Sequence, residues 1–292
     1  MQNFNYHTHT YRCGHADNIS DEKYVEEAIK IGLKELAFTD HAPMKSGLDD
    51  RREMRMAYDQ KQEYLDSINA LKEKYKGQIK ILAGFEVEYI PGLEKDLLEL
   101  RKDSDLLVLG QHFVLSDGGQ DISRVWAAPF TERELLRYAG YIESATKMHL
   151  VDIIAHPDLY LLNTMQHYGE LENAIAYLIC ESAAEHRTPL EINLSRIATI
   201  AREKGYDIND TEHVGWLNEV EYPNKRFWES AAAFGDVPVI YGIDAHHEGE
   251  IENFQALQRL AEIKLGDKII NHLKFVEDSP IKRKDKSDDE GR

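Results

Sequence analysis

The sequence predicts an α/β fold, a parallel sheet covered by helices, because short apolar segments alternate with amphipathic ones along the chain. A length of 292 residues is ordinary for a single α/β barrel. Neither a GxGxxG nor a GxxxxGK[ST] loop follows any predicted strand, so the sequence does not indicate a nucleotide-binding form of this fold. The alternation by itself leaves open whether the sheet closes into a barrel or stays doubly wound.

Seven short apolar segments are predicted to be strands. They lie at residues 4–8, 35–39, 79–87, 106–111, 151–155, 190–194 and 237–243. Helical patterns separate them, so neighbouring strands are expected to run parallel. No sequence repeat and no Pro/Gly-rich linker divides the chain, and one domain is therefore expected.

Helices are predicted between these strands from apolar residues recurring at helical spacing. The segment 20–32 begins at Ser20, a favourable N-cap residue, and the segment 51–75 stops before Gly77. Further helices are expected at 93–101, 131–149, 171–185, 225–234 and 252–264. Three longer irregular stretches, 44–53, 116–129 and 196–223, each follow a strand and should lie on the face where barrel active sites occur.

The composition is that of a globular and strongly acidic protein, with 42% hydrophobic and 30% charged residues. A total of 35 Lys and Arg against 53 Asp and Glu gives a net charge of −18, which argues against nucleic-acid and anionic-membrane partners. Only two cysteines, Cys13 and Cys180, are present, and no signal peptide or membrane span is recognised, so a cytoplasmic location is expected. Residues 1–275 are expected to form the barrel and 276–292 a charged tail.

Metal-binding residue types stand where the predicted strands end. Several are two residues apart, as in His7 and His9, and such a pair shares one face of a strand. The carboxyl ends of parallel strands in a barrel meet at one face, so these side chains should converge. Imidazole and carboxylate groups ligate zinc, iron and manganese. The predicted metal ligands are His7, His9, His15, His41, Glu86, His112, His156, Asp244 and His246. Nine ligands imply more than one ion.

Each of these residues also has a simpler interpretation when it is taken alone. One His-x-His pair is weak evidence, and a histidine at a strand end is more often hydrogen-bonded or solvated. Glu88 is either a substrate group or a neighbour that supports the ligands, and Cys13 is a less favoured soft ligand. His247 should point away from the site. The concentration of ligand types at successive strand ends is what favours a metal centre.

The order of the motifs resembles the polymerase-and-histidinol-phosphatase (PHP) family over about the first 250 residues. The motifs are HTHTYRCGHA (7–16), TDH (39–41), GFEVEY (84–89), GQH (110–112), AHPD (155–158), EINLSR (191–196) and GIDAH (242–246). Within that family, the CGHA that follows the HxHT block is similar to barrel-type histidinol-phosphate phosphatases. The resemblance implies hydrolysis of L-histidinol phosphate in histidine biosynthesis.

The resemblance further implies a distorted (β/α)7 barrel with three divalent ions, variously zinc, iron or manganese, and a metal-bridging hydroxide as nucleophile. The first ion would take His7, His9, Glu86 and Asp244. The second would take Glu86, His112 and His156, with Glu86 bridging, and the third His15, His41 and His246.

Roles for the substrate are predicted for a few further polar residues. Arg196 is expected to clamp phosphate in a bidentate manner, with a salt bridge at the barrel rim as the alternative. Asp17 is the preferred general acid and a further substrate contact. Asp40 is the other candidate acid, but its position directly before His41 favours a role in orienting His15 or His41. Glu88, or less favourably Asp158, would bind the substrate ammonium, and a loop carrying Arg124 and Trp126 would cover its imidazole ring.

Three other functions compete with a phosphomonoesterase. A nuclease of the same family would need a basic track or stacking platform for its strand, which the acidic composition does not favour. An amidohydrolase also uses His-x-His in a barrel, but the ordered motifs from Glu86 to His156 favour the phosphatase. An inactive binding module should have lost ligands, and none of the nine is missing.

Overall fold

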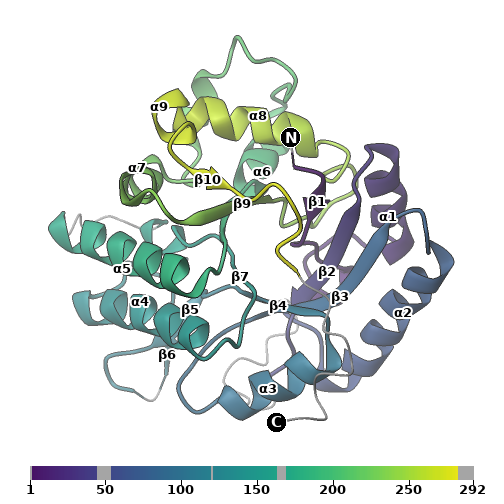
Figure 1. The fold of residues 1–292 in the computed structure, drawn as a ribbon, viewed down its shortest axis with the longest axis horizontal. Coiled ribbons are helices and arrows are strands. Elements are labelled where there is room, and N and C mark those ends of the chain that lie inside the picture. The colour runs from purple at the N-terminus through teal and green to yellow at the C-terminus, as the bar shows by residue number, and fades with distance from the viewer. Residues whose placement is uncertain (1, 45–53, 120, 163–168, 282–292) are drawn as a thin grey trace.

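The computed structural model describes residues 2–44, 54–119, 121–162 and 169–281. Its main sheet has its strands at the centre of the molecule, with helices arranged around them (Figure 1). The strands are β1 (Phe4–Asn5), β2 (Glu35–His41), β3 (Lys80–Val87), β4 (Leu106–Leu109), β7 (Ile153–Ile154), β8 (Leu190–Asn193), β9 (Pro238–Gly242) and β10 (Lys274–Phe275). The first seven correspond to the seven predicted strands, and β10 was not predicted.

The sheet is parallel throughout and closes on itself. Its strand order is β1-β2-β3-β4-β7-β8-β9-β10, and a parallel bridge between Thr8 and Ala245 joins the extensions of β1 and β9. His9 N donates to Ala245 O at 2.9 Å, and Ala245 N donates to His7 O at 3.3 Å. This bridge closes a seven-stranded barrel. The eighth strand, β10, pairs with β9 and lies outside the ring, which makes the barrel irregular.

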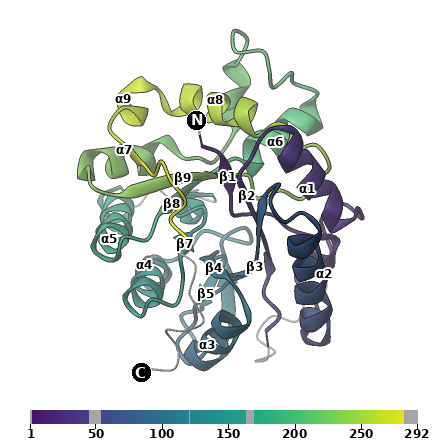
Figure 2. The same cartoon turned by 45° about the vertical axis from the view of Figure 1, so that its right-hand side comes forward.

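Helices surround the strands of the barrel (Figures 1 and 2). They are α1 (Asp21–Lys30), α2 (Lys61–Lys74), α3 (Glu94–Asp103), α4 (Glu132–Lys147), α5 (Glu170–His186), α6 (Ser195–Lys204), α7 (Lys225–Phe234), α8 (Phe254–Leu265) and α9 (Asp267–Ile270). The predicted helix 51–75 is shorter in the structure: a 3-10 turn, Tyr58–Gln60, precedes α2, and residues 51–53 lie outside the described residues.

Two stretches predicted to be irregular contain secondary structure. The prediction for 196–223 was wrong at its start, because α6 follows β8 almost directly and buries Ile197, Ile200 and Ala201 at helical spacing. The stretch 116–129 contains β6 (Ile122–Arg124), which pairs in an antiparallel hairpin with β5 (Phe113–Leu115). Of the stretch 44–53, residues 45–53 lie outside the described residues.

Apolar side chains form one core inside the barrel and a larger one between strands and helices. The interior core joins Phe4, Leu82, Val108 and Ile240 to Ile281 near the C-terminus. The backbone N–H of Val276 donates to Val239 O at 2.9 Å, so the chain continues against the barrel after β10. The predicted boundary between barrel and tail at residue 275 is therefore too early, and packed structure extends to 281.

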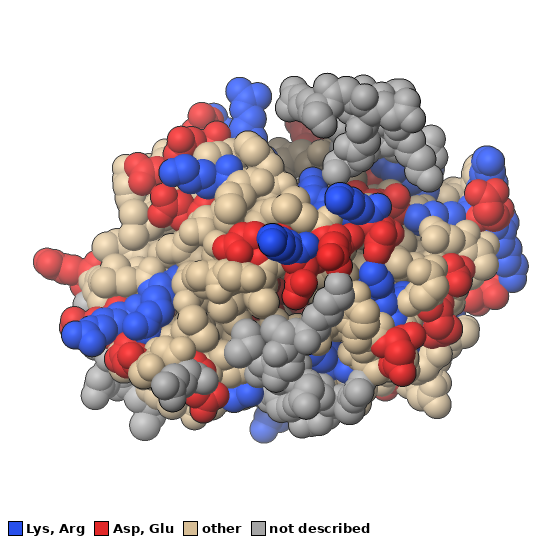
Figure 3. Space-filling model, turned by 90° about the horizontal axis from the view of Figure 1, so that it is seen from below, with Lys and Arg blue, Asp and Glu red and all other residues tan. Residues whose placement is uncertain are grey.

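The molecular surface carries charges of both signs. Figure 3 shows Lys and Arg side chains scattered among Asp and Glu over one face. Such intermixing offers a polyanion little continuous attraction on that face. Within the described ranges, no helix has the length and apolar character that crossing a bilayer requires.

Candidate metal centre

The nine predicted ligand residues lie together at the carboxyl ends of the barrel strands. Consecutive pairs of imidazole rings are close enough to form a continuous cluster. The ring-centroid distances are 4.2 Å for His9–His246, 4.5 Å for His9–His41, 4.5 Å for His15–His246, 4.8 Å for His112–His156 and 5.1 Å for His7–His9. Residues far apart in the chain thus share one site because the strands around the barrel end at the same face.

Glu86, on β3, is the centre of this cluster. Its carboxylate oxygens face ring nitrogens from several strand ends. The nitrogens are His41 Nδ1 at 2.8 Å, His156 Nε2 at 3.1 Å, His7 Nε2 at 3.5 Å, His9 Nε2 at 3.5 Å and His112 Nε2 at 3.6 Å. Gly110 makes room for this carboxylate, since a Cβ there would come within 1.9 Å of Glu86 Oε1. A carboxylate so placed can bridge two ions.

Asp244 closes the cluster from the end of β9. Its Oδ1 lies 3.0 Å from His9 Nε2 and 3.4 Å from His7 Nε2. Asp244 and His156 both have positive φ, 53° and 29°, a conformation that costs free energy for residues other than glycine. Strain of this kind persists where the surroundings fix a side chain, and here it aims two predicted ligands at the same centre.

Several buried polar atoms of the cluster have no hydrogen-bond partner among the described residues. They include His7 Nε2, His9 Nε2, His156 Nδ1 and His246 Nε2. Buried nitrogens and oxygens without partners cost free energy unless a further group satisfies them. Converging imidazole nitrogens and carboxylate oxygens are the ligand types that divalent cations such as zinc prefer.

The donor atoms fall into groups whose members lie within 4.8 Å of one another. One group, His7 with His9 and Glu86, belongs to the predicted first set. Another joins His41 and His246 to His9, whereas His15 groups with Cys13 and His246. His41 and His15 of the predicted third set thus each group with His246. Cys13 is closer to it than the sequence suggested, although burial raises the pKa of its thiol.

Opposing charges shift the pKa values throughout the cluster. Burial alone lowers the pKa of His7 and His9, but the carboxylates around them outweigh burial, and the pKa of His9 reaches about 9. Burial lowers the pKa of His41 and His246 well below the ordinary value, and the charge of His9 adds to this against the opposing effect of Glu86 and Asp244. Burial also opposes ionisation of Glu86, yet the neighbouring imidazoles hold its pKa well below the usual range. The carboxylates of the cluster are therefore ionised, and some of the imidazoles carry protons. Divalent cations that bind here would displace those protons.

A second layer of carboxylates holds the outer nitrogens of several of these rings. Glu191 Oε1 lies 2.9 Å from His7 Nδ1, and Asp40 Oδ1 lies 3.5 Å from His9 Nδ1. A carboxylate on one ring nitrogen fixes the orientation of the other toward a metal. Asp40 was predicted to orient His15 or His41, but the histidine beside its carboxylate is His9. The pairing of β1 with β2 brings His9 next to Asp40.

Glu191 was not singled out from the sequence. It stands on β8, where its Oε2 accepts hydrogen bonds from Asn193 Nδ2 at 2.9 Å and from the backbone N–H of His156 at 3.2 Å. Gly242 on the neighbouring strand leaves space for it, since a Cβ there would lie 1.7 Å from Glu191 Oε1. Glu191 stands two residues before Asn193, so the two side chains share one face of the strand. This spacing could have identified Glu191 from the sequence.

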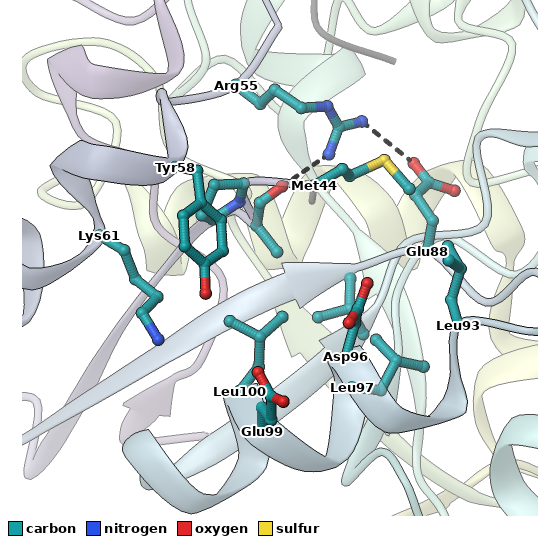
Figure 4. Close-up of a pocket in the computed structure, with 13 residues that line it drawn as sticks. Met44, Arg55, Tyr58, Lys61, Glu88, Leu93, Asp96, Leu97, Glu99 and Leu100 are labelled. Atoms are coloured by element: carbon teal, nitrogen blue, oxygen red, sulfur yellow. Dashed lines mark hydrogen bonds and ion pairs between the residues drawn. The ribbon is translucent and has the colours of Figure 1, made fainter. Parts of the chain in front are cut away.

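Glu88 supports His112. Its Oε1 lies 2.7 Å from His112 Nδ1, and its Oε2 accepts a hydrogen bond from the backbone N–H of the same residue at 2.9 Å. Arg55 approaches from the other side, 3.9 Å from Glu88 Oε1, and donates to Ala42 O at 2.9 Å (Figure 4). Glu88 is only 5% exposed. These contacts favour the supporting role over the predicted contact with a substrate ammonium group.

The two other predicted active-site groups, Asp17 and Arg196, have partners at the rim. Asp17 Oδ1 lies 2.9 Å from His247 Nδ1, and this hydrogen bond lowers the pKa of Asp17. His247 thus pairs with Asp17 at the rim. Arg196 lies on α6 and donates to Glu221 from Nε at 2.6 Å and from Nη2 at 3.0 Å, which is the rim salt bridge considered as its alternative.

Asp158 lies behind His156 rather than at the open face. It is 1% exposed and accepts a hydrogen bond from Asn224 N at 2.5 Å. Burial raises its pKa to about 6. Its position in the wall of the barrel does not favour the predicted contact with a substrate ammonium group.

Comparison with known proteins identifies relatives of this chain. A protein of Deinococcus radiodurans named "Probable histidinol-phosphatase" is 29% identical over 267 residues, covering 88% of this chain and 91% of that protein. Histidinol-phosphatase of Bacillus subtilis is 27% identical over 267 residues, covering 86% and 96%. The crystal structure of histidinol phosphate phosphatase from Lactococcus lactis, complexed with zinc, L-histidinol and phosphate, superposes with a TM-score of 0.64 at 17% identity. That match covers 97% of this chain and 99% of the other and shows a common fold. The family model described as PHP domain matches residues 5–195, about two thirds of the chain. The chain belongs to the PHP domain family.

Proposed function

We propose that this protein is a histidinol-phosphatase, which hydrolyses L-histidinol phosphate to L-histidinol and phosphate in histidine biosynthesis. The observation that carries the proposal is the imidazole cluster around Glu86, whose buried donor atoms lack partners among the described residues. The two relatives named as histidinol-phosphatases, each matched over most of its length, support the choice of substrate.

The cluster would hold three divalent ions, either zinc, iron or manganese. The proposed ligands are His7, His9, Glu86 and Asp244 for the first, Glu86, His112 and His156 for the second, and His15, His41 and His246 for the third. Adjacent divalent ions lower the pKa of a water bound between them and neutralise a phosphate, which supplies the nucleophile and the charge stabilisation for monoester hydrolysis. The zinc bound to the Lactococcus lactis enzyme supports divalent metal in this fold.

The chain's other polar groups would position this site. Glu191, Asp40 and Glu88 hold the outer nitrogens of His7, His9 and His112, so that the inner nitrogens face the metal ions. Arg196 remains the proposed phosphate ligand. Its guanidinium group donates two parallel hydrogen bonds to the carboxylate of Glu221, and the same pair of donors fits two oxygens of a phosphate. We also infer a cytoplasmic location, since both cysteines are buried and unpaired.

The test of this function is a substrate comparison on metal-replete protein. The protein is purified without chelators, its metal content is measured, and phosphate release is followed with L-histidinol phosphate, glycerol 2-phosphate, 2-aminoethyl phosphate and a phosphodiester. A clear preference for L-histidinol phosphate with about three metals per chain is expected. Faster turnover of another monoester, or of the diester, would contradict the proposed substrate while keeping a metallophosphoesterase. Absence of bound metal after reconstitution would contradict the whole proposal.

Asp17→Asn tests the general acid predicted from the sequence. The hydrogen bonds of Asp17 to His247 and to the backbone N–H of Glu248 are those of an ionised carboxylate, which is a poor proton donor at neutral pH. We therefore expect kcat to fall by less than about threefold, because general acid catalysis usually contributes about 10²-fold or more. The pH dependence of kcat in the two proteins is the measurement. A fall of about 10²-fold together with loss of the basic limb of the profile would restore Asp17 as the acid.

A further inference from the structure

Trp126 lies beside His112 at the edge of the histidine cluster. Its indole centroid lies 5.9 Å from the ring centroid of His112, a proposed ligand, with an angle of 59° between the ring planes. Trp126 is 37% exposed, whereas Trp216 is 6% exposed and Trp228 is fully buried. Part of the Trp126 side chain is therefore accessible to solvent beside a proposed metal ligand.

The segment that carries Trp126 is tied to the strand end that carries His112. The backbone N–H of Val125 donates to His112 O at 3.0 Å, and the Val125 side chain is buried. On the other side, the N–H of Ala127 donates to Arg124 O at 3.1 Å. The β5–β6 hairpin is itself anchored to α4 by a hydrogen bond from Ser123 to Glu134. These contacts fix the position of the backbone at Trp126 relative to His112. The indole is therefore preorganised for binding a ligand.

We propose that Trp126 is the specificity-determining residue for the alcohol half of the substrate, with its indole stacked on the imidazole ring of L-histidinol phosphate. The proposal rests on the function proposed above. In that substrate three carbon atoms separate the ester oxygen from the imidazole ring, a span of roughly 5 Å at about 1.5 Å per bond. A phosphate at the cluster would thus leave its imidazole within reach of an indole only one ring beyond His112.

The chemistry of an indole suits this ligand. A flat, polar heteroaromatic ring stacks on an aromatic face, and its protonated form gains a cation–π attraction for which tryptophan is the best partner. A phosphomonoester without an aromatic ring gains no such stacking. Trp126 should therefore favour substrates that carry an imidazole ring over phosphomonoesters that do not. The metal centre would bind the phosphate of both.

Two substrates and three variants test the proposal. L-histidinol phosphate and 2-aminoethyl phosphate share the phosphate ester and the amine, but only the first carries an imidazole. The ratio of their kcat/KM values is measured for the unmodified protein, Trp126→Leu and Trp126→Phe. Tyr177→Leu, on the exposed face of α5, is the matched control, since its ring is 54% exposed and α5 supplies none of the proposed ligands.

The ratio should fall about tenfold in Trp126→Leu, chiefly through KM for L-histidinol phosphate, and be largely rescued in Trp126→Phe. Metal content should stay at the unmodified value, and Tyr177→Leu should keep the unmodified ratio. An unchanged ratio in Trp126→Leu would overturn the proposal. Equal losses on both substrates together with lost metal would also overturn it, because Trp126 would then act by packing against His112.

Fluorescence gives a readout that needs no turnover. Titration of metal-replete protein with L-histidinol should change the tryptophan emission, and Trp126→Phe should lose that change although Trp216 and Trp228 remain. A change that persists in Trp126→Phe would overturn the proposal. If the unmodified protein releases no phosphate from L-histidinol phosphate, the proposed function fails; if it does and the ratio is insensitive to residue 126, only the role of Trp126 fails.

Discussion

Glu86→Gln should lose most of its bound metal and at least about 10³-fold in kcat/KM for L-histidinol phosphate. Glu86 is 2% exposed, and its two oxygens face a ring of imidazoles, so no neighbouring residue can take its place. An amide has the same shape but no negative charge, and its NH₂ group would point at a cation or a ring nitrogen. Loss of several kcal/mol of charge stabilisation corresponds to a rate change of this size.

The measurement is metal content per chain alongside steady-state kinetics, with the fold checked by circular dichroism. Glu181→Gln, an exposed glutamate on α5, is the matched control and should behave as the unmodified protein. A Glu86→Gln protein that keeps its full metal content and its rate would contradict the central position assigned to Glu86. A protein that keeps the fold but not the metal would support it.

Removal of metal should abolish activity and lower the melting temperature by about 10 °C. A ligand present at about 1,000 times its dissociation constant stabilises the folded state by about 4 kcal/mol, and each kcal/mol shifts the melting temperature of a chain this size by about 2–4 °C. The stabilisation should be large here because the metal would satisfy buried nitrogens that otherwise lack partners among the described residues.

Chelation should also depend on pH in a definite direction. In the metal-free site the pKa of His9 is about 9, so a proton competes with the metal for this ring below that pH. Metal affinity should therefore rise as the pH rises from about 6 to about 9, and chelators should strip the protein more readily at the lower pH. Thermal unfolding with and without EDTA, followed by readdition of zinc or manganese, measures both effects. An unchanged melting temperature after verified metal loss would contradict the stabilisation, and pH-independent affinity would contradict proton competition at His9.

The sequence predicted those features that depend on one strand at a time. The alternation of apolar segments and the two-residue spacing of His7 and His9 are local patterns, and they predicted the strands and the histidines that the structure brings together. Helix α6 was missed because β8 passes into it within one residue, without the Gly or Pro that would mark a boundary. The family resemblance added the closed barrel, which the alternation alone left undecided.

The supporting contacts could not be predicted in the same way, because each joins residues far apart in the chain. Glu191 meets His7 only after β8, β9 and β1 have come into register. The partner of Arg196, Glu221, and the partner of Asp17, His247, lie on other segments of the rim. The pairing of a surface arginine or aspartate depends on loop geometry, which hydrophobic periodicity does not encode.

Closure of the barrel by the Thr8–Ala245 bridge sets an order on the biogenesis of the enzyme. During synthesis most of the proposed ligands, from His7 to His156, leave the ribosome well before Asp244 and His246 have been added. The nascent chain therefore exposes a set of metal-binding histidines before the strand that completes the site has been made. Correct metallation must wait for the segment after β9 to pair with the segment after β1, so metal uptake would report closure of the barrel in the cell.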